Sequence, residues 1–550
     1  MSFWNTVLDP SGSGDVPFGS RLIPTIIDEL ASTEPHRICF SFPRSTEIAD
    51  GFRDVGFRTF ANAINKTAHF IHQEIGRSSM FETVMYMGYP DVRHYIVLVA
   101  LMKTGHKVLF SSHRNSVAGH ADLIRKTDCT VLMHTAGFPA NGILEKCRME
   151  TLCMPELDYL LDDAICEPYP YTRTWEEAQK HPCLVLHSSG STGLPKPIVW
   201  THSMFGMMDA QNKVPPLDGR LCVRGAFAND VRRFYSTLPI YHAGGLAAGI
   251  ARFCFNKNTV VIGPPETVTA EIVDQVLQFG DVDAAHFLPE TLEQIAHHPN
   301  ILAKLGRLTH VMYGGGPLAE QVGKTIARHV LLLNGIGSTE TSYLVLHTTD
   351  KEDFSYICLN EAYSGIEMRP IGDLFELVFV RDQEHEIFQG AFVVYPRLKE
   401  YSMSDLYSKH PTKPHHWKLE GRKDDMIVLK NGWNVNPIVH EQLITNHPAV
   451  QNCVLVGRGQ DKPAAIIELR SDYYTEEKER QKSVAEAIWP NIDKANSVAA
   501  TPDQLDRHHI IFAKKEKPFA IASKGTVQRK ATVRMYEQEI AELYASMEIR

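Results

Sequence analysis

The sequence predicts an α/β fold: a large N-terminal domain of α/β-layered subdomains with a β region, and a small α+β C-terminal domain. Strand-like apolar runs alternate with segments of helical spacing, which favours parallel sheets covered by helices on both faces. Several of these runs end in glycine-rich loops, where open α/β sheets bind their ligands. A polar turn at residues 421–425 separates the large domain, residues 1–420, from the small one, residues 426–550.

The first 180 residues begin this alternation. Apolar spacing predicts helices over residues 22–30, 57–66 and 95–102, with Thr59 as the cap of the second and Gly105 ending the third. Strands are expected between and after them, at residues 83–86, 108–110 and 130–133. Residues 150–180 carry Pro, Asp, Glu and Tyr without a clear period, so we expect a surface connection there.

The second half of the large domain repeats the pattern and then changes it. Thr201 is expected to cap a helix, and both Pro289 and Pro317 suit the first position of one. Strands are expected at residues 235–238, 259–262, 284–288, 310–313 and 329–333. Residues 376–380 and 391–395 alternate more strictly and predict a separate β region.

The small domain is expected to mix three strands with helices, and it closes the chain with a charged amphipathic helix. The strands are predicted at residues 426–429, 453–456 and 464–469, and the helices at residues 438–446, 483–488 and 531–547.

Composition excludes several classes of function. A formal net charge of −9 gives no electrostatic reason to expect a nucleic-acid partner. The ten cysteines include no Cys-x-x-Cys pair, so neither a zinc site nor a disulfide scaffold is indicated. We find no basic-then-apolar leader and no apolar stretch long enough for a bilayer, so we expect a cytoplasmic protein without a membrane partner.

A loop of small hydroxylated residues and glycines connects two apolar, β-prone runs within residues 186–201. Glycines there leave backbone N–H groups uncovered, hydroxyls add donors, and a lysine adds a cation, so the loop can surround phosphate oxygens. These residues are Ser188, Ser189, Gly190, Ser191, Thr192, Gly193 and Lys196. The loop lacks the Walker spacing Gly-x-x-x-x-Gly-Lys-[Ser/Thr]. An ordinary Ser/Gly surface loop is the alternative.

The run Ser-Ser-Gly-Ser-Thr-Gly-Leu-Pro-Lys-Pro, residues 188–197, resembles the phosphate-loop signature of the adenylate-forming superfamily. That superfamily includes acyl- and aryl-CoA ligases, luciferases, and the adenylation domains of peptide synthetases and carboxylic acid reductases. The resemblance covers most of the chain, from about residue 59 to about residue 530, with its motifs in the expected order. It implies ATP and Mg²⁺ as cofactors and a small C-terminal domain that moves.

Residues 334–340 resemble the nucleotide segment of the same superfamily. The resemblance implies that Thr339 contacts the α-phosphate as a catalytic residue and that Asn334 pairs with the adenine edge. Glu340 is the implied Mg²⁺ ligand, since Mg²⁺ prefers oxygen ligands shared with phosphates. Gly335, Ile336 and Ser338 complete the implied nucleotide contacts, although the family has an aromatic residue where Ile336 stands. A dinucleotide loop is rejected because Glu340 occupies its third glycine position.

Near the domain boundary, the resemblance to the same superfamily implies two residues that contact the nucleotide and one about which the small domain rotates. Asp405 corresponds to the family's ribose-binding carboxylate, Arg422 to a ribose or phosphate contact, and Asp424 to the hinge. The segment 523–530 resembles the family's catalytic-lysine segment and places Lys524 two residues before the strict position. Lys524 is the predicted catalytic lysine, with Lys517 and the pair Lys514–Lys515 as substitutes.

The acid pocket is expected beside the segment Tyr-His-Ala-Gly-Gly, residues 241–245. His242 resembles the family's gating residue and is assigned to catalysis and substrate binding. The backbone at Gly315 and Gly316 is expected to approach both the substrate and the adenine closely, so these two glycines are also predicted to contact the nucleotide. The predicted substrate residues are His242, Ala243, Gly314, Gly315 and Gly337. Amino-acid-activating relatives have an Asp just after His242, so an α-amino acid is a less favoured substrate than an aryl or aliphatic acid.

The resemblance implies that a small carboxylic acid attacks Mg·ATP, which gives an acyl-adenylate and pyrophosphate. The segment 524–532 and His113-Arg-Asn-Ser look most like fungal synthetase-like carboxylic acid reductases, so a phosphopantetheinyl carrier domain is the expected acceptor. Neither a carrier site nor Gly-x-Gly-x-x-Gly follows residue 530, which fits an excised adenylation domain. The alternatives are a free-standing AMP-forming acyl- or aryl-CoA ligase and a non-catalytic nucleotide-binding protein.

Overall fold

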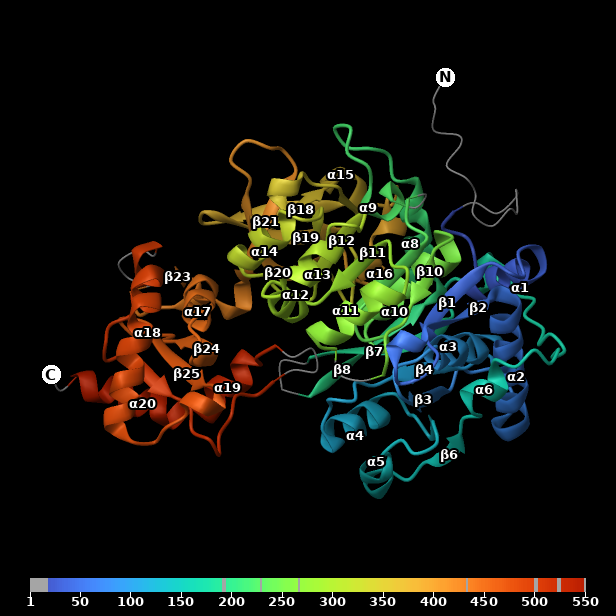
Figure 1. Ribbon diagram of the computed structural model, residues 1–550, viewed down its shortest axis with the longest axis horizontal. Coiled ribbons are helices and arrows are strands. Elements are labelled where there is room, and N and C mark those ends of the chain that lie inside the picture. Colours follow the sequence, from blue (N-terminus) through green and yellow to red (C-terminus); the bar gives the residue numbers. More distant parts are fainter. Residues whose placement is uncertain are drawn as a thin grey trace.

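The computed structural model describes residues 18–189, 194–227, 230–265, 268–431, 434–498, 503–521 and 526–548. It confirms the predicted fold class, because a large α/β part with an antiparallel β region precedes a smaller α+β part (Figure 1). The smaller part has an apolar core of its own, formed by residues such as Ile427, Val450 and Ile492. The exact boundaries at residues 420 and 426 stay predictions.

The first sheet has six strands and carries the Ser/Gly loop at one edge. Its order is β6-β5-β3-β4-β7-β8, and only β7 and β8 pair antiparallel. The strands are β3 (Thr83–Met87), β4 (Lys107–Phe110), β5 (Val131–His134), β6 (Glu150–Cys153), β7 (Pro182–Ser189) and β8 (Pro195–Thr201).

The second sheet has seven strands in the order β13-β12-β11-β9-β10-β1-β2, all parallel except the β1–β2 pair. The strands are β1 (Ile38–Pro43), β2 (Phe52–Gly56), β9 (Arg233–Ser236), β10 (Thr259–Val261), β11 (Ala284–Phe287), β12 (His310–Gly314) and β13 (Leu332–Gly335). Among the helices of the large domain are α1 (Ile23–Thr33), α2 (Phe57–Ile75), α3 (Arg93–Thr104), α4 (Val117–Lys126), α8 (His202–Ala210), α10 (Ala243–Ile250), α11 (Ala270–Phe279), α12 (Pro289–Ile295), α13 (Pro299–Leu305) and α14 (Glu320–Ala327).

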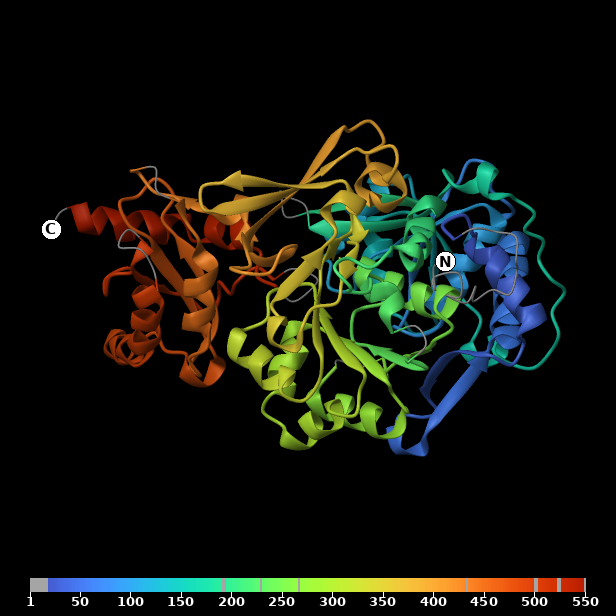
Figure 2. The same cartoon turned by 90° about the horizontal axis from the view of Figure 1, so that it is seen from above.

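The third sheet is antiparallel and has six strands, in the order β16-β17-β21-β20-β19-β18. In Figure 2 its yellow and orange strands lie between the orange-red C-terminal part and the blue and green elements of the first two sheets. The strands are β16 (Leu346–His347), β17 (Tyr356–Leu359), β18 (Ile366–Ile371), β19 (Leu374–Val380), β20 (Glu400–Lys409) and β21 (His416–Arg422).

The small domain pairs a three-stranded sheet with helices and a short ribbon of β22 (Ile427–Val428) and β23 (Asn434–Val435). The sheet consists of β24 (Val450–Val456), β25 (Ala464–Leu469) and β26 (Ile510–Phe512). Its helices are α17 (Pro437–Thr445), α18 (Lys478–Val498), α19 (Arg529–Met535) and α20 (Glu537–Glu548). The predicted closing helix is therefore two helices, with Tyr536, whose ring is buried, at the junction.

Four further local predictions were wrong. Residues 391–395, predicted as a strand, lie mostly in the short helix α16 (Gly390–Val394), because Ala391 and Phe392 pack into the core of the antiparallel sheet. Gly56, rather than Thr59, precedes the first turn of α2, and α14 begins three residues after Pro317. Residues 150–180 contain β6, α6 (Leu157–Leu160) and α7 (Trp175–Ala178), so they are more than a connection.

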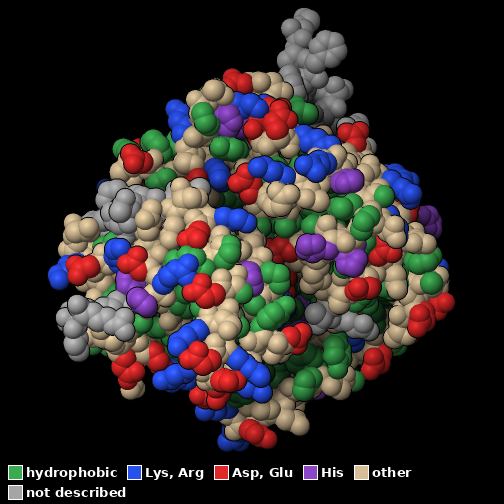
Figure 3. Space-filling view, turned by 60° about the vertical axis from the view of Figure 1, so that its left-hand side comes forward, with side chains coloured by type: hydrophobic (Ala, Val, Ile, Leu, Met, Phe, Trp, Pro, Cys, Tyr) green, Lys and Arg blue, Asp and Glu red, His purple; other side chains and the backbone are tan. Residues whose placement is uncertain are grey.

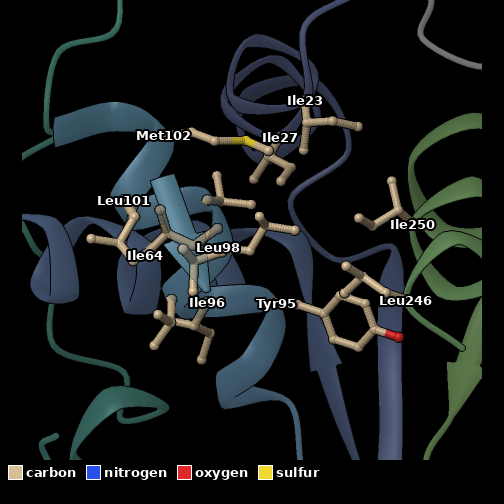
Figure 4. Packing of buried hydrophobic residues seen from close by; sticks show 14 of the residues in the cluster. Ile23, Ile27, Ile64, Tyr95, Ile96, Leu98, Leu101, Met102, Leu246 and Ile250 are labelled. Atoms are coloured by element: carbon tan, nitrogen blue, oxygen red, sulfur yellow. The ribbon is translucent and has the colours of Figure 1, made fainter. Parts of the chain in front are cut away.

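Helix α3 lies at the centre of the largest apolar cluster. All twelve of its residues are buried, and Figure 4 shows Ile96, Leu98 and Leu101 among side chains of neighbouring helices. Its one lysine, Lys103, donates to both carboxylate oxygens of Asp28, at 2.7 and 2.8 Å. Because α3 is buried on every face, other elements must cover it all round, so it organises the helices of this half of the protein.

A buried ion pair ties the start of the described chain to α8. The Arg21 Nε donates to Asp209 at 2.9 Å, and the Gly19 backbone N–H donates to the same carboxylate at 2.7 Å. The Arg21 and Asp209 side chains are only 3% and 0% exposed. Removing one partner of such a pair leaves an uncompensated buried charge.

We therefore expect Asp209→Ala to lower the free energy of unfolding of the large domain by about 3–5 kcal/mol. Urea unfolding followed by tryptophan fluorescence measures the loss. The control is Glu400→Ala, because Glu400 pairs with Arg369 on the surface and should leave the midpoint unchanged. Equal midpoints for the two variants would contradict a stabilising role of the buried pair.

Candidate functional site

Two parallel strands of the second sheet end side by side, and predicted site glycines lie at their carboxyl ends. β12 and β13 are in register at Gly314 and Gly335. A Cβ on Gly314 would lie 2.5 Å from the Gly335 carbonyl oxygen, so only glycine fits there. Gly315 follows with a φ of +89°, which turns the chain away from the strand. The predicted glycine wall thus lies at the carboxyl edge of the sheet, together with Gly316.

A tight hairpin follows β13 and presents Thr339 and Glu340 at its tip. The hairpin pairs β14 (Gly337–Ser338) with β15 (Ser342–Tyr343). The Ser338 hydroxyl oxygen accepts from the Glu340 and Thr341 N–H groups, each at 3.2 Å. A Cβ on Gly337 would lie 2.3 Å from the Ser342 carbonyl oxygen, so this close pairing requires glycine.

The first sheet holds this tip in place through two hydrogen bonds. The Trp200 indole N–H of β8 donates to the Thr339 carbonyl at 2.8 Å. The Ser188 hydroxyl, near the end of β7, donates to Glu340 Oε1 at 2.9 Å. Ser188 also faces Lys196 across the β7–β8 ladder, so both ends of the Ser/Gly loop lie at the hairpin. The structure therefore brings the predicted phosphate loop and the predicted metal ligand together.

Parts of that loop are not described. The predicted contacts Gly190, Ser191, Thr192 and Gly193 lie outside the described residues. Ser189 pairs with Pro195 in the β7–β8 ladder. Their roles in binding phosphate stay predictions.

A row of tyrosines links Lys196 to the ribose-binding candidates. Lys196 Nζ donates to the Tyr395 hydroxyl at 3.0 Å, and this hydrogen bond raises the pKa of Lys196. The ring of Tyr395 stacks on that of Tyr401, with centroids 5.5 Å apart. Burial raises the pKa of Tyr401, and the nearby Glu340 and Asp405 raise it further. Sequence reasoning missed both tyrosines, since an isolated aromatic residue in a β-prone stretch carries no signal of its own.

Asp405 and Arg422 face each other across β20 and β21. They are register partners, and Arg422 Nε lies 3.8 Å from Asp405 Oδ1. Arg422 also donates to the Met403 carbonyl at 3.1 Å, which orients its guanidinium. Burial raises the pKa of Asp405 to about 6, although Arg422 opposes this shift. A carboxyl of this kind changes charge close to neutral pH.

The predicted acid-gating residue lies where β9 leads into α10. His242 immediately precedes α10, its side chain is buried, and its ring meets that of His187 edge-on at 5.9 Å. Two residues further on, the Gly244 carbonyl accepts from the Tyr343 hydroxyl of the hairpin at 3.0 Å. Ala243 lies between them as the first residue of the helix. The His242 segment and the Thr339–Glu340 hairpin are therefore neighbours.

Two predicted nucleotide contacts have partners within the protein. The Asn334 amide donates to the Ser355 carbonyl at 3.4 Å. Ile336 is buried in the apolar cluster of the antiparallel sheet with Leu344 and Leu346. Their contacts with adenine stay predictions.

The predicted hinge lies in an exposed turn between the domains. Asp424 sits in the turn Lys423–Asp425, and Lys530 Nζ of α19 lies 3.9 Å from its carboxylate. Lys524 lies outside the described residues. Of its three substitutes, Lys514 and Lys517 both donate to Glu539, whereas the backbone N–H of Lys515 donates to the Tyr474 hydroxyl. An ion pair of this kind favours a structural role for these two lysines.

The geometry suits a nucleotide-dependent, adenylate-forming enzyme: the Ser188 hydroxyl of the first sheet contacts the Glu340 carboxylate of the hairpin, and Lys196 pairs with Ser188 across the β7–β8 ladder. The chain belongs to the AMP-binding enzyme family, whose model matches residues 27–361, and the model of the AMP-binding enzyme C-terminal domain matches residues 424–548. It is thus an AMP-forming, ligase-type enzyme that uses ATP.

Curated relatives support this assignment over almost the whole chain. A carboxylic acid reductase of Neurospora crassa is 34% identical over 544 residues, which cover 97% of this chain and 51% of that protein. The isocyanide synthase-NRPS hybrid crmA of Aspergillus fumigatus is 33% identical over 545 residues, which cover 98% of this chain and 34% of that protein. The chain therefore spans about half, or less, of the length of these relatives.

Solved structures support the fold. The anthranilate CoA ligase AuaEII in complex with anthranoyl-AMP matches with a TM-score of 0.71 and 15% identity, covering 96% of this chain and 99% of that one. A benzoate CoA ligase from Burkholderia xenovorans LB400 matches with a TM-score of 0.67 and 16% identity, covering 92% and 99%. No helix among the described residues has the length and apolar character needed to cross a membrane. On the face drawn in Figure 3, basic and acidic side chains are interspersed.

The buried carboxyl of Asp405 predicts a pH dependence of ATP binding. The resemblance assigns Asp405 to the ribose hydroxyls, and its pKa of about 6 means that it is ionised, and so a full acceptor, only at higher pH. We expect the Kd for ATP to rise about tenfold as the pH falls from 7 to 5. The Asp405→Asn variant should bind ATP more weakly, and its Kd should no longer show this rise between pH 7 and pH 5. Since ATP titrates equally in both measurements, parallel pH profiles for variant and wild type would contradict the role of Asp405.

Proposed function

We propose that the chain activates a small carboxylic acid with Mg·ATP, giving an acyl-adenylate and pyrophosphate, and then passes the acyl group to a phosphopantetheine thiol. The observation that carries this proposal is the hydrogen bond from Ser188 to Glu340, which joins the phosphate loop to the Thr339–Glu340 hairpin. The family match supports the use of ATP. The acid and the thiol are proposed from the sequence resemblance and from the name of the Neurospora crassa relative.

The residues of the site suit an in-line attack on the α-phosphorus. Ser188 and Lys196 offer a hydroxyl and an ammonium group to the phosphate oxygens, and Thr339 offers a hydroxyl to the α-phosphate. Asp405 and Arg422 hold the ribose side of the nucleotide. His242 borders the carboxylic acid. Fixed donors of this kind act by positioning and by stabilising the charge that develops in the transition state.

The donor set also fits a magnesium ion. Among the described residues, no group of three or more His, Cys, Asp and Glu side chains is arranged to hold a metal ion. Mg²⁺ commonly binds through one or two carboxylates together with phosphate oxygens, so Glu340 alone is sufficient on the protein side. When bound there, the ion would neutralise phosphate charge.

The length of the relatives supports a carrier domain as the acceptor. The matched proteins are about two to three times as long as this chain, and one is named a carboxylic acid reductase. We infer that the acyl group moves to the thiol of a carrier domain. Rotation about Asp424 would replace the adenylation face of the small domain by a thiol-binding face.

The test is ATP–pyrophosphate exchange with a panel of carboxylic acids. We expect at least one acid to stimulate exchange, and Glu340→Gln to reduce the rate by about 100- to 1,000-fold because a charge-stabilising group is lost. Glu400→Gln, on the surface, is the control. Exchange with no acid in the panel would favour a nucleotide-binding protein without catalysis. Release of an acyl-CoA when CoA is supplied would favour a free-standing ligase over carrier loading.

A comparison of two lysine variants tests which lysine is catalytic. We expect Lys524→Ala to reduce exchange by about 100-fold or more, because the resemblance assigns this cation to the charge that develops on the reacting phosphate. Lys517→Ala should keep most of the activity, since Lys517 is engaged with Glu539. The opposite ranking of the two variants would move the catalytic role to Lys517 and leave the family assignment intact.

A further inference from the structure

A small cavity of about 40 Å³ lies beside the hairpin that carries Thr339 and Glu340. The residues of its lining that matter here are Arg224, Phe234, Arg252, His286, Gly335 and Tyr343. They come from the second sheet, the hairpin, the short helix α9 (Val223–Ala226) and one turn of π-helix at Ala251–Phe255.

The cavity adjoins the residues that the sequence assigns to the acid. Gly335 is the register partner of Gly314, one of the predicted wall glycines. The hydroxyl of Tyr343 reaches the Gly244 carbonyl, two residues after His242. A carboxylic acid bound at His242 would therefore have its far end in or near this cavity.

Two arginines line the cavity without a carboxylate partner among the described residues. Arg252 is 3% exposed, its guanidinium lies 4.3 Å from the centre of the Phe234 ring, and it donates to Asn258 Oδ1 at 3.3 Å. The Arg224 guanidinium lies 5.4 Å from the centre of the Tyr343 ring. No described Asp or Glu oxygen lies within ion-pair distance of either one. The buried Arg21, by contrast, has Asp209.

The other titratable groups of the cavity do not balance these charges. Burial lowers the pKa of His286 to about 3 and raises that of Tyr343 to about 12, so both are neutral at pH 7. Burial also raises the pKa of the Cys222 thiol. Burial lowers the pKa of Arg252 to about 9, which leaves it protonated. At neutral pH the cavity therefore has two positive charges and no described negative one.

A buried charge without a counter-charge is unfavourable, and a guanidinium pairs best with a planar carboxylate. We propose that the acid activated at this site is a compact dicarboxylic acid, whose second carboxylate is bound by Arg224 and Arg252. This inference rests on the proposed function, since it names the substrate class of the same site. The small volume of the cavity suits a carboxylate on a short chain.

The test compares matched acids in the ATP–pyrophosphate exchange assay. Succinate, glutarate and phthalate are each paired with the monocarboxylate in which a methyl group replaces one carboxylate: butyrate, valerate and 2-methylbenzoate. We expect at least one dicarboxylate to exceed its partner in kcat/KM by about 100-fold. Arg252→Met should lower this ratio by about 100-fold, mainly through KM, because the charge is removed while an apolar side chain of similar length remains.

Two further variants separate recognition from folding. Arg224→Gln tests the second guanidinium if Arg252→Met does not fold, as judged by its thermal midpoint. The matched control is Arg37→Met, because Arg37 also lies over a phenylalanine, 4.7 Å from the centre of the Phe57 ring, and does not line the cavity. It should leave the ratio unchanged.

The outcomes are distinct. A monocarboxylate that equals or exceeds its dicarboxylate partner in every pair overturns this inference and leaves the proposed function intact. A ratio that neither folded cavity variant changes overturns it as well. Exchange with no acid of any kind overturns the proposed function, and the inference with it.

Discussion

The candidate site depends on the fixed position of one hairpin tip. Thr339 and Glu340 sit at the end of a turn of only a few residues, and a hairpin of this length is marginal by itself. Two hydrogen bonds from the first sheet, Trp200 to the Thr339 carbonyl and Ser188 to the Glu340 carboxylate, hold the tip against a second sheet. This link lets glycine loops that are distant in the sequence face one another.

The parts of the fold that the sequence predicted are those with a strong local pattern. Helix α3 ends at Gly105 in the left-handed conformation, as the glycine suggests, and Pro289 begins α12. Residues 391–395 were misjudged because Ala391 and Phe392 are buried by tertiary packing, and a run of apolar residues alone does not distinguish a short buried helix from a strand. The break in the closing helix at Tyr536 likewise depends on packing that the sequence does not reveal.

The candidate site likewise contains some residues that the sequence could predict and others that it could not. Motif residues such as Ser188, Glu340 and Arg422 could be selected from spacing and resemblance, and the first two contact each other at the hairpin. Trp200, Tyr395 and Arg252 could not, because a single aromatic or basic residue gives no pattern until the sheets place it. Arg252 is 3% exposed in a turn of π-helix, where sequence reasoning would sooner expect an apolar residue.

The cross-strand pair of Asp405 and Arg422 has a mechanical consequence. Arg422 ends β21, and Asp424 follows only two residues later in the exposed turn. Arg422 is held by its contacts with Asp405 and Met403, so the rotation that we propose about Asp424 would begin next to a residue whose position is fixed. A ligand bound to Arg422 would then also restrict the rotation proposed about Asp424. The same arginine would in that case affect both how long the ligand stays bound and when the small domain moves.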